Sequence, residues 1–413
     1  MSEKISPEIR FKWFTDDWEP RKLGEIAEII GGGTPSTNNP TYWDGDIDWY
    51  APAEIGEQIF AKGSVRKITK EGLSHCSARI LPAYKTVLFT SRAGIGNMAI
   101  LQHPAATNQG FQSLVCHNDI EPYFVFSMGN NIKAAAECVA TGSTFDEISG
   151  KKLSKLEFMF PDIAEQQVIG ACFKNIDMLI TIHKHKLTKL QLLKKSMLTK
   201  MFPKDGARVP EIRFRGFHGD WEQRTLGEIA KEKLSNGLMN NQSDEPTKVR
   251  HINVIDMYTP DKIHISDLTY SKYDEAAIKK CNVEYGDIFM TRSSLKPEGI
   301  AEANVLLNSG KYVYDDHLIR LKVIQNAYDP IFVKISLGNK MIKSQFIQKS
   351  KTAAFTTIGQ DDVAGCSGMF PCYKEQQKIG NYFMNLDYII TLHQRKLSKL
   401  QKIKQAMLSK LFV

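Results

Sequence analysis

Apolar side chains recur with a heptad spacing in two stretches of the chain, and the steps alternate between four and three residues in both. The repeating positions are Ile176, Ile180, His183, Leu187, Leu190, Lys194, Met197 and Met201 in the first stretch, and Leu386, Ile390, His393, Leu397, Leu400, Lys404, Met407 and Leu411 in the second. This pattern is typical of a coiled-coil seam and predicts two long helices. The histidines and lysines interrupt both seams at the same places, which favours a role in fixing the register.

The two stretches are copies of one frame. Phe160-Pro161 with Glu165-Gln166-Gln167 opens the first helix, and the same residues recur 210 positions later. Asp162, with Glu165 three residues on, is predicted to cap the first helix. Further upstream, Pro7–Phe11 recurs as 210–214. Matched copies usually pair about a twofold axis, which makes the helices antiparallel. A parallel pair is less favoured because it would crowd the two inserts at one end.

The segments between the copies differ, and both read as mixed strand, loop and short helix. Strands are predicted at 86–90, 97–101, 287–291 and 318–323, and helices near 122–139 and 330–350. Turn signals such as Gly31-Gly32-Gly33-Thr34-Pro35 are frequent in both segments. The fold class is therefore α+β, with two α/β recognition domains, a pair of long antiparallel coiled-coil helices and an internal pseudo-twofold repeat. The predicted boundaries are 1–155 for the first domain, 156–202 for the first helix, 203–365 for the second domain and 366–413 for the second helix.

The charge lies in the repeated helices. The chain has 413 residues and a net charge of +8, and residues 165–202 and 375–413 each hold seven basic and two acidic side chains. Such a basic block attracts polyanions, although lysines that merely solvate a helix surface are an equally good interpretation. We find no apolar run long enough for a membrane span and no signal peptide, and we expect a cytoplasmic protein. The 7 cysteines are scattered and support neither a zinc site nor a disulfide framework.

Polar, basic turns follow an apolar strand in each insert. Thr90-Ser91-Arg92-Ala93-Gly94 and Thr291-Arg292-Ser293-Ser294 place an arginine among hydroxyls, which suits phosphate or guanine contacts; a plain surface turn is an equal alternative. Asn108-Gln109 and Asn240-Asn241-Gln242 could read adenine edges, although amides are also common in loops. The candidate DNA-contacting residues are Thr34, Ser36, Ser91, Arg92, Asn108, Gln109, Asn240, Lys248, Arg250, Arg292, Ser293 and Ser294.

Signatures of catalysis are missing from the sequence. Gly31-Gly32-Gly33 is not a dinucleotide fingerprint, and Gly150-Lys151-Lys152 is not a phosphate loop. Asn39-Pro40-Thr41-Tyr42 is similar to an adenine methyltransferase motif, but Thr41 replaces its second proline and no glycine-rich AdoMet motif accompanies it. No cluster has metal-ligand spacing, and we expect neither catalytic residues nor a metal in this chain.

Over nearly its whole length, the chain resembles the DNA-specificity subunit of type I restriction–modification enzymes. The resemblance rests on the Trp-Glu-x-x-x-Leu-Gly-Glu-Ile entries at Trp18 and Trp221, the Gly33–Ser36 turn with Tyr42-Trp43, the Glu-Gln-Gln helix openings and the duplicated coil. It implies a non-catalytic subunit whose inserts each read half of an asymmetric double-stranded DNA site, with the helices as a ruler.

The resemblance also implies partners. Two methyltransferase subunits using AdoMet and two ATP- and Mg-dependent restriction subunits would join this chain, which would hold no cofactor itself. Docking candidates are Glu165, Gln166, Gln167, Glu375, Gln376 and Gln377. The second insert lacks the Thr-Pro-Ser and Tyr-Trp cues of the first. The alternative hypothesis is a non-catalytic assembly scaffold without direct DNA readout.

Overall fold

The computed structural model describes residues 7–92, 94–140, 147–204 and 206–412. Residues 1–6 of the first predicted domain, Ala93 of its polar turn and Val413 of the second predicted helix lie outside these ranges. The chain divides into two compact units, Met1–Ile182 with Leu397–Val413, and His183–Lys396. We call them unit 1 and unit 2. None of the helices in the described ranges is long and apolar enough to cross a membrane.

Unit 1 is a mixed α and β unit. Its strands are β1 (Glu19–Lys22), β2 (Ala27–Gly31), β3 (Trp43–Tyr50), β4 (Phe60–Ala61), β5 (Arg66–Ile68), β6 (Thr86–Phe89), β7 (Met98–Leu101), β8 (Ala105–Thr107), β9 (Gln112–Cys116) and β10 (Glu157–Phe160). Its short helices are α1 (Leu23–Ile26), α2 (Lys70–Ser74), α3 (Pro122–Ser127), α4 (Gly129–Val139) and α5 (Gly150–Leu153), with single 3-10 turns at Pro40–Tyr42 and Pro52–Glu54. The strands form a five-stranded sheet in the order β2-β9-β6-β7-β4, a three-stranded sheet β5-β3-β8 and the pair β1-β10.

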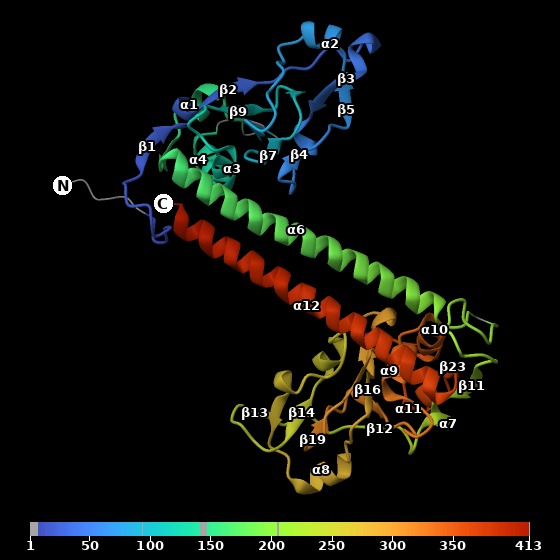
Figure 1. Ribbon diagram of the computed structural model, residues 1–413. Helices are drawn as coiled ribbons and strands as arrows, with labels where there is room; N and C mark the ends of the chain where they lie inside the picture. The colour runs from blue at the N-terminus through green and yellow to red at the C-terminus, as the bar shows by residue number, and fades with distance from the viewer. Residues whose placement is uncertain (1–6, 93, 141–146, 205, 413) are drawn as a thin grey trace. The chain divides into compact units, whose positions relative to one another are not determined.

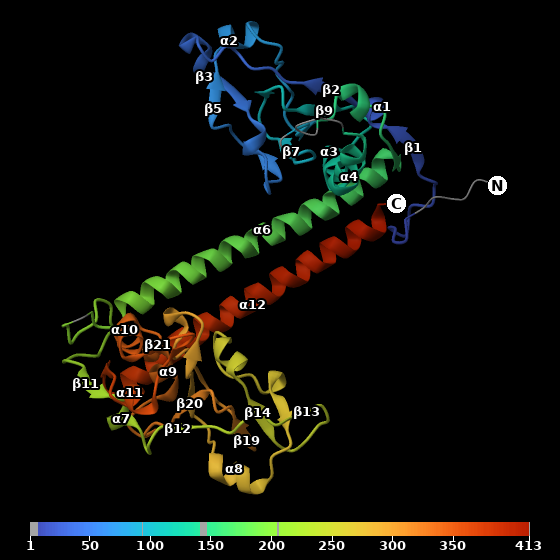
Figure 2. The same ribbon diagram turned by 180° about the vertical axis from the view of Figure 1, so that it is seen from behind.

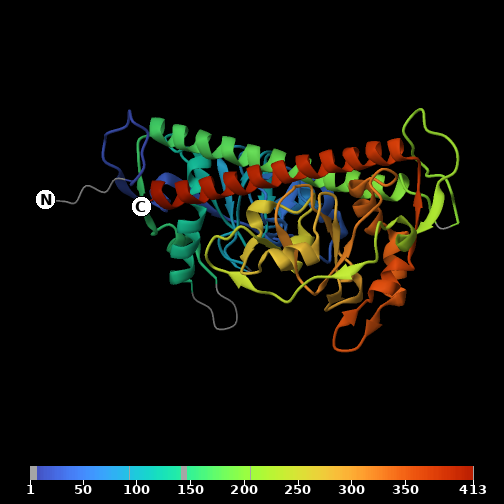
Figure 3. The ribbon, with the colours of Figure 1, turned by 90° about the horizontal axis from the view of Figure 1, so that it is seen from below.

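Unit 2 repeats this plan with shorter strands. They are β11 (Glu222–Thr225), β12 (Ser235–Asn236), β13 (Gln242–Ser243), β14 (Arg250–Ile252), β15 (Thr269–Ser271), β16 (Ile288–Thr291), β17 (Ser293–Ser294), β18 (Ala303–Val305), β19 (Tyr312–Tyr314), β20 (Leu318–Leu321), β21 (Lys351–Thr352), β22 (Thr356–Thr357) and β23 (Ser367–Phe370). The helices are α7 (Leu226–Ile229), α8 (Glu275–Cys281), α9 (Pro330–Leu337), α10 (Lys340–Lys349) and α11 (Gln360–Ala364), with 3-10 turns at Val254–Tyr258, Ile265–Asp267 and Pro297–Gly299. The sheets are β12-β20-β16-β18, β13-β15-β14-β19, β17-β22-β21 and the pair β11-β23. Figure 3 shows the β21–β22 hairpin, in orange-red, extending from the region of α9–α11.

The predicted strands and helices of the inserts are confirmed. The apolar runs at 86–90 and 287–291 form β6 and β16, which are interior strands of their sheets and whose residues are all buried. The segments near 122–139 and 330–350 each form a pair of helices, α3 with α4 and α9 with α10. Seen from behind in Figure 2, α3 and α4 lie beside the first turns of the long helix that follows them.

The two long helices are α6 (Ile163–Lys200) and α12 (Tyr373–Leu411), drawn in green and red in Figure 1. The main-chain N–H of Glu165 donates to Asp162 Oδ1 over 2.7 Å, which confirms the predicted cap. From Ile176 onward along α6, every predicted seam position is at least half-buried, and most of the other side chains are exposed. A heptad repeat therefore selects the buried face of this helix, as the spacing predicts.

Within each unit the two long helices contribute segments that run antiparallel. In unit 1, Phe173 stacks on Phe412 at 5.9 Å and Lys404 Nζ lies 2.6 Å from Asp177 Oδ1. In unit 2, Phe202 lies 6.4 Å from Phe383, and Lys194 Nζ lies 2.5 Å from Asp387 Oδ1. The members of the two charge pairs are related by the repeat. Also in unit 2, His183 Nδ1 meets its own copy, His393 Nδ1, at 2.8 Å.

The start of each repeat is tied to the end of a long helix. In unit 1 the main-chain N–H of Ile9 donates to the Lys410 carbonyl at 3.3 Å, and Glu8 pairs with the same lysine. In unit 2 the N–H of Ile212 donates to the Lys200 carbonyl at 2.8 Å, and Glu211 pairs with that lysine. The same attachment thus occurs once between the two ends of the chain and once across a short connection.

Candidate nucleic-acid interface

Three segments of unit 1 bring polar side chains to one end of the five-stranded sheet. Thr34 follows β2, Arg92 follows β6, and Asn108 with Gln109 lies in the turn between β8 and β9. The Thr34 hydroxyl donates to Gln109 Oε1. The N–H of Ser91 donates to the carbonyl of Gly110, the next residue of that turn, at 2.8 Å. We call this group the unit 1 edge; it unites five of the six residues predicted for the first insert.

The side chains of the unit 1 edge differ in what they can reach. Gln109 is exposed and Arg92 is half-buried, so both have access to a ligand. Ser91 is fully buried, and its Oγ has no partner among the described residues. The prediction that Ser91 contacts DNA is therefore wrong, because its side chain is buried. Asn108 Oδ1 accepts the Gly110 N–H at 2.7 Å, so this oxygen closes the turn.

Ser36 lies beside this group on an exposed loop. Its carbonyl accepts the indole N–H of Trp43 at 3.1 Å, which anchors the loop to the core. Trp43 and Trp49 are buried and meet edge to face at 5.2 Å. These aromatic residues are therefore part of the core, and Arg66 stacks over the Trp43 ring at 3.6 Å.

Unit 2 builds an equivalent edge from different residues. Thr90 N–H bonds the Asn97 carbonyl in unit 1, and Thr291 N–H bonds the Glu302 carbonyl in unit 2. The next residue, Ser91 or Arg292, donates its N–H to Gly110 or His317, each at 2.8 Å. Its carbonyl accepts from Ile148 or Ile358, each at 3.0 Å. Arg292 thus occupies the position of Ser91, and Ser293 that of Arg92.

This one-residue shift changes which side chains of the second polar turn are exposed. Arg292 is exposed, which leaves its guanidinium free to approach a ligand. Ser293 and Ser294 are half-buried in β17 and pair with Thr357 and Thr356 of β22. The arginine that the sequence aligns with Arg92 therefore sits one residue earlier on the same main-chain frame.

Of the remaining predicted residues of unit 2, Arg250 begins β14, and Asn240 and Lys248 lie in the loops before β13 and β14. Asn240 and Lys248 are exposed. Arg250 is half-buried; its guanidinium donates to the Leu268 carbonyl at 3.0 Å and stacks over the Tyr270 ring at 3.8 Å. Arg250 is the first residue of β14 and pairs with Tyr312. The polar edge lies at the other end of this strand, where the carbonyl of Ile252 accepts the N–H of Asp315. The structure therefore gives Arg250 a packing role and does not group it with Arg292.

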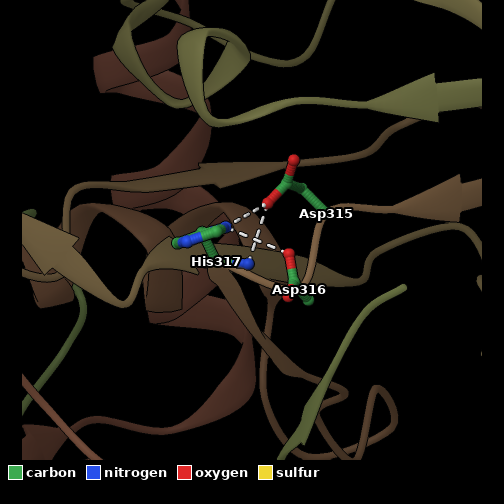
Figure 4. Close-up of side chains that lie close together, drawn as sticks. All are labelled: Asp315, Asp316 and His317. Carbon is green, nitrogen blue, oxygen red and sulfur yellow. Dashed lines mark hydrogen bonds and ion pairs between the residues drawn. The ribbon is translucent and has the colours of Figure 1, made fainter. Parts of the chain in front are cut away.

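Sequence reasoning missed an acid–histidine cluster at the unit 2 edge. Asp315, Asp316 and His317 occupy the turn that corresponds to Asn108–Gly110, and their side chains converge (Figure 4). His317 Nδ1 lies 3.1 Å from Asp315 Oδ1 and 3.0 Å from Asp316 Oδ1. The sequence signal for this cluster is three consecutive residues of types that bind metals. Motif rules based on ligands spaced apart in the sequence do not detect such a run.

The first two residues of each Glu-Gln-Gln triplet are buried inside the protein. Glu165 is buried and accepts two bonds from Arg10, at 2.8 and 2.6 Å. This hydrogen bonding raises the pKa of the Arg10 guanidinium. Glu375 accepts the same bonds from Arg213 at 2.7 Å, with the same effect on the pKa of that arginine.

The middle residue of each triplet joins the long helix to the insert. Gln166 Oε1 accepts the N–H of Glu121 at 3.1 Å, and its Nε2 donates to Pro161 at 2.9 Å. Gln376 makes the equivalent bonds to Asp329 and Pro371. Burial removes Glu165, Gln166, Glu375 and Gln376 from the surface, which corrects their assignment to docking. Gln167 and Gln377 are exposed and stay candidates.

The two halves match one family model twice. The model for the type I restriction modification DNA specificity domain covers residues 15–192 and 218–402. The chain belongs to the type I restriction–modification specificity subunit family. Each match spans one insert and most of its long helix, which agrees with the repeat seen in the fold. The two inserts correspond to the target recognition domains of this family.

Similar proteins cover the full length of the chain. The MjaIX specificity subunit of a type I restriction enzyme from Methanocaldococcus jannaschii is 26% identical over 98% of this chain and 97% of its own length. The putative MjaX specificity subunit from the same organism is 22% identical over 95% and 92%. The crystal structure of an S subunit of a type I restriction–modification system from M. genitalium has a TM-score of 0.65 at 15% identity and covers 99% of both chains. That structure shares the fold.

Proposed function

We propose that this specificity subunit reads a bipartite, asymmetric DNA site, one half with each unit. The supporting observation is that both units carry a polar turn on the same main-chain hydrogen bonds, with unlike side chains projecting from it. Arg92 with Gln109 in one unit, and Arg292 beside the acidic turn of Asp315–His317 in the other, present different groups to a ligand. Arginine suits guanine or phosphate, and amides suit adenine.

The proposal includes the coiled coil as a spacer. Antiparallel segments in each unit, the repeat-related Lys–Asp pairs and the contact of His183 with His393 support one antiparallel pair with a pseudo-twofold axis. Such a pair would hold two unlike readers on one duplex. We further propose that two methyltransferase and two restriction subunits dock on this frame and supply AdoMet, ATP and Mg²⁺ chemistry, with Gln167 and Gln377 as surface candidates for docking.

Exchange of one insert tests the central claim. Residues 21–154 are replaced by the matching insert of a relative with a different target, and methylated sites are mapped by single-molecule sequencing in cells that hold the partner methyltransferase. We expect one half of the site to change while the other half and the gap stay the same. The reciprocal exchange of residues 224–364 is the matched control and should change only the other half. A change in both halves, or in neither, contradicts the proposal.

Lengthening both long helices tests the spacer. One added heptad in each extends a helix by about 10 Å, which corresponds to about three base pairs at ~3.4 Å per step. We expect a wider gap with unchanged half-sites. An unchanged gap, or altered half-sites, would argue against the ruler.

The alternative is an assembly scaffold without direct DNA readout, favoured only by the basic helices. A scaffold predicts weak DNA binding with little salt dependence, whereas a reader that contacts several phosphates loses affinity steeply as salt rises. Measuring the DNA affinity of the complex at several salt concentrations separates the two.

A further inference from the structure

The acid–histidine cluster of unit 2 has the composition of a metal site. Asp315, Asp316 and His317 each offer one ligand atom, and these atoms all lie within 4.8 Å of one another. Figure 4 shows the imidazole of His317 facing both carboxylates. The separations of 3.0 and 3.1 Å are close to those between two ligands that share one ion at about 2.1 Å.

A fourth side chain points into the cluster from the sheet behind it. His251 of β14 is fully buried, and neither of its ring nitrogens has a hydrogen-bond partner among the described residues. Its Nε2 lies 3.9 Å from Asp315 Oδ2. Buried polar atoms without a partner are rare and call for an explanation. A small rotation of the Asp315 carboxylate would give this nitrogen its bond.

We propose that this cluster binds one divalent transition-metal ion, with Asp315, Asp316 and His317 as ligands. His251 is a positioning residue: it hydrogen-bonds the carboxylate of Asp315 and holds it toward the ion, as outer-shell partners of metal ligands do. A set of two carboxylates and one imidazole suits ions such as Zn²⁺ or Co²⁺. Mg²⁺ and Ca²⁺ prefer oxygen ligands throughout, so imidazole disfavours them.

Unit 1 supplies a natural comparison for this site. Asn108-Gln109-Gly110 forms the same turn, since Asn108 Oδ1 accepts the Gly110 N–H just as Asp315 Oδ1 accepts the His317 N–H, at 2.7 and 2.8 Å. That turn has neither carboxylate nor imidazole. The proposed ion is therefore specific to unit 2. If unit 2 reads DNA, as proposed above, the ion would also offset two negative charges at an edge that approaches phosphates.

Cobalt titration of the full-length chain tests the site. The chain is stripped with a chelator and titrated with Co²⁺ while visible absorption is recorded, and competition with Zn²⁺ follows. We expect one ion per chain with the spectrum of nitrogen and oxygen ligands. Absence of saturable binding would overturn the proposal. So would an intense near-ultraviolet thiolate band at one equivalent, because it would place the ion on cysteines.

Two variants assign the ligands. Replacing Asp315-Asp316-His317 with Asn-Gln-Gly copies the unit 1 turn and keeps its main-chain bond, and Asp316→Asn changes one half-exposed ligand alone. Each should weaken Co²⁺ binding at least about tenfold, with circular dichroism unchanged. His103→Gln, at an exposed histidine of unit 1, is the control and should bind as the wild type does. Equal affinity in all variants would refute the assignment. If the insert exchange gave a result that contradicts the DNA-reading proposal, the outcome of these metal titrations would not change.

Discussion

The unit 1 and unit 2 edges share a main chain and differ in almost every side chain that can reach a ligand. In both units, main-chain N–H and carbonyl groups form equivalent hydrogen bonds at matching distances. On that frame Ser91 is replaced by Arg292, Arg92 by Ser293, and Asn108–Gly110 by Asp315–His317. The comparison teaches that the position of the edge is set by hydrogen bonds that any sequence can make. Its chemistry is therefore free to vary.

Equivalent substitutions in the shared main-chain frame should destabilise the two units equally. Glu165→Gln and Glu375→Gln each remove a buried carboxylate from a two-bond contact with an arginine. We expect each to lower the free energy of unfolding by about 3 kcal/mol, because a largely buried guanidinium loses its counter-charge. Chemical denaturation with hydrogen exchange to separate the units measures it. Gln167→Ala, at the exposed neighbour, should stay within about 0.5 kcal/mol. Clearly unequal losses would contradict the shared frame.

The seam aspartates should respond unequally. Asp177 accepts the Tyr123 hydroxyl at 3.0 Å as well as Lys404, while Asp387 pairs with Lys194 and favours the charged form of the nearby Lys334. We expect Asp387→Asn to cost about 2 kcal/mol, because its loss leaves lysines uncompensated. Asp177→Asn should cost about 1 kcal/mol, since it leaves one lysine, Lys404, uncompensated and its other partner, Tyr123, is neutral. Unfolding by denaturant measures both, and a larger loss for Asp177→Asn would reverse the argument.

The arginines should act on separate halves of the DNA site. Arg92→Ala and Arg292→Ala each should weaken DNA binding by about 1–3 kcal/mol if the arginine contacts a base. Discrimination should relax in one half-site only. Arg92→Lys and Arg292→Lys keep the charge but lose the two-pronged geometry, so they should retain salt dependence and lose discrimination. Binding to a panel of site variants measures this, and uniform weakening across the panel would instead indicate a phosphate contact.

The smallest expected effect at neutral pH comes from Lys334, where unit 1 has Phe126. Burial lowers the pKa of the Lys334 ammonium to about 8. Its Nζ donates to the Pro260 carbonyl at 2.8 Å. Between about pH 8 and 10.5 the unfolded chain holds this proton and the folded chain has lost it, so this group makes the free energy of unfolding rise with pH.

Lys334→Phe, which copies unit 1, should remove that rise. Denaturation curves at pH 7, 8, 9 and 10 for the two proteins measure it, and the difference should move in favour of the wild type as pH increases. Phe126→Leu is the control in unit 1 and should shift stability by the same amount at each pH. A constant difference between wild type and Lys334→Phe would contradict the lowered pKa.

Periodicity was enough to predict much of the frame. The heptad spacing identifies the half-buried face of both long helices, and the Asp162 cap and the strands β6 and β16 follow from local rules. Local rules work here because each of these features depends on neighbours within a few residues.

The candidate site was predicted less well, for physical reasons. Ser91 and Arg292 look unlike in sequence, and only the long-range bonds to Gly110 and His317 show that they are equivalent. The Glu-Gln-Gln triplet suits a surface or an interior equally until the partners from Arg10 and Arg213 are known. His251 reaches Asp315 through the parallel pairing of β14 with β19, which no local pattern encodes.

The attachment of each repeat's first residues to a helix end has a consequence for connectivity. Ile9 meets Lys410 where the chain has two ends, and Ile212 meets Lys200 where it is continuous. A short linker from the last residue to the first, with a new start in the exposed stretch 206–209, should leave every one of these contacts in place. A circular permutant that begins at the other repeat should therefore keep these attachments and fold to the same architecture.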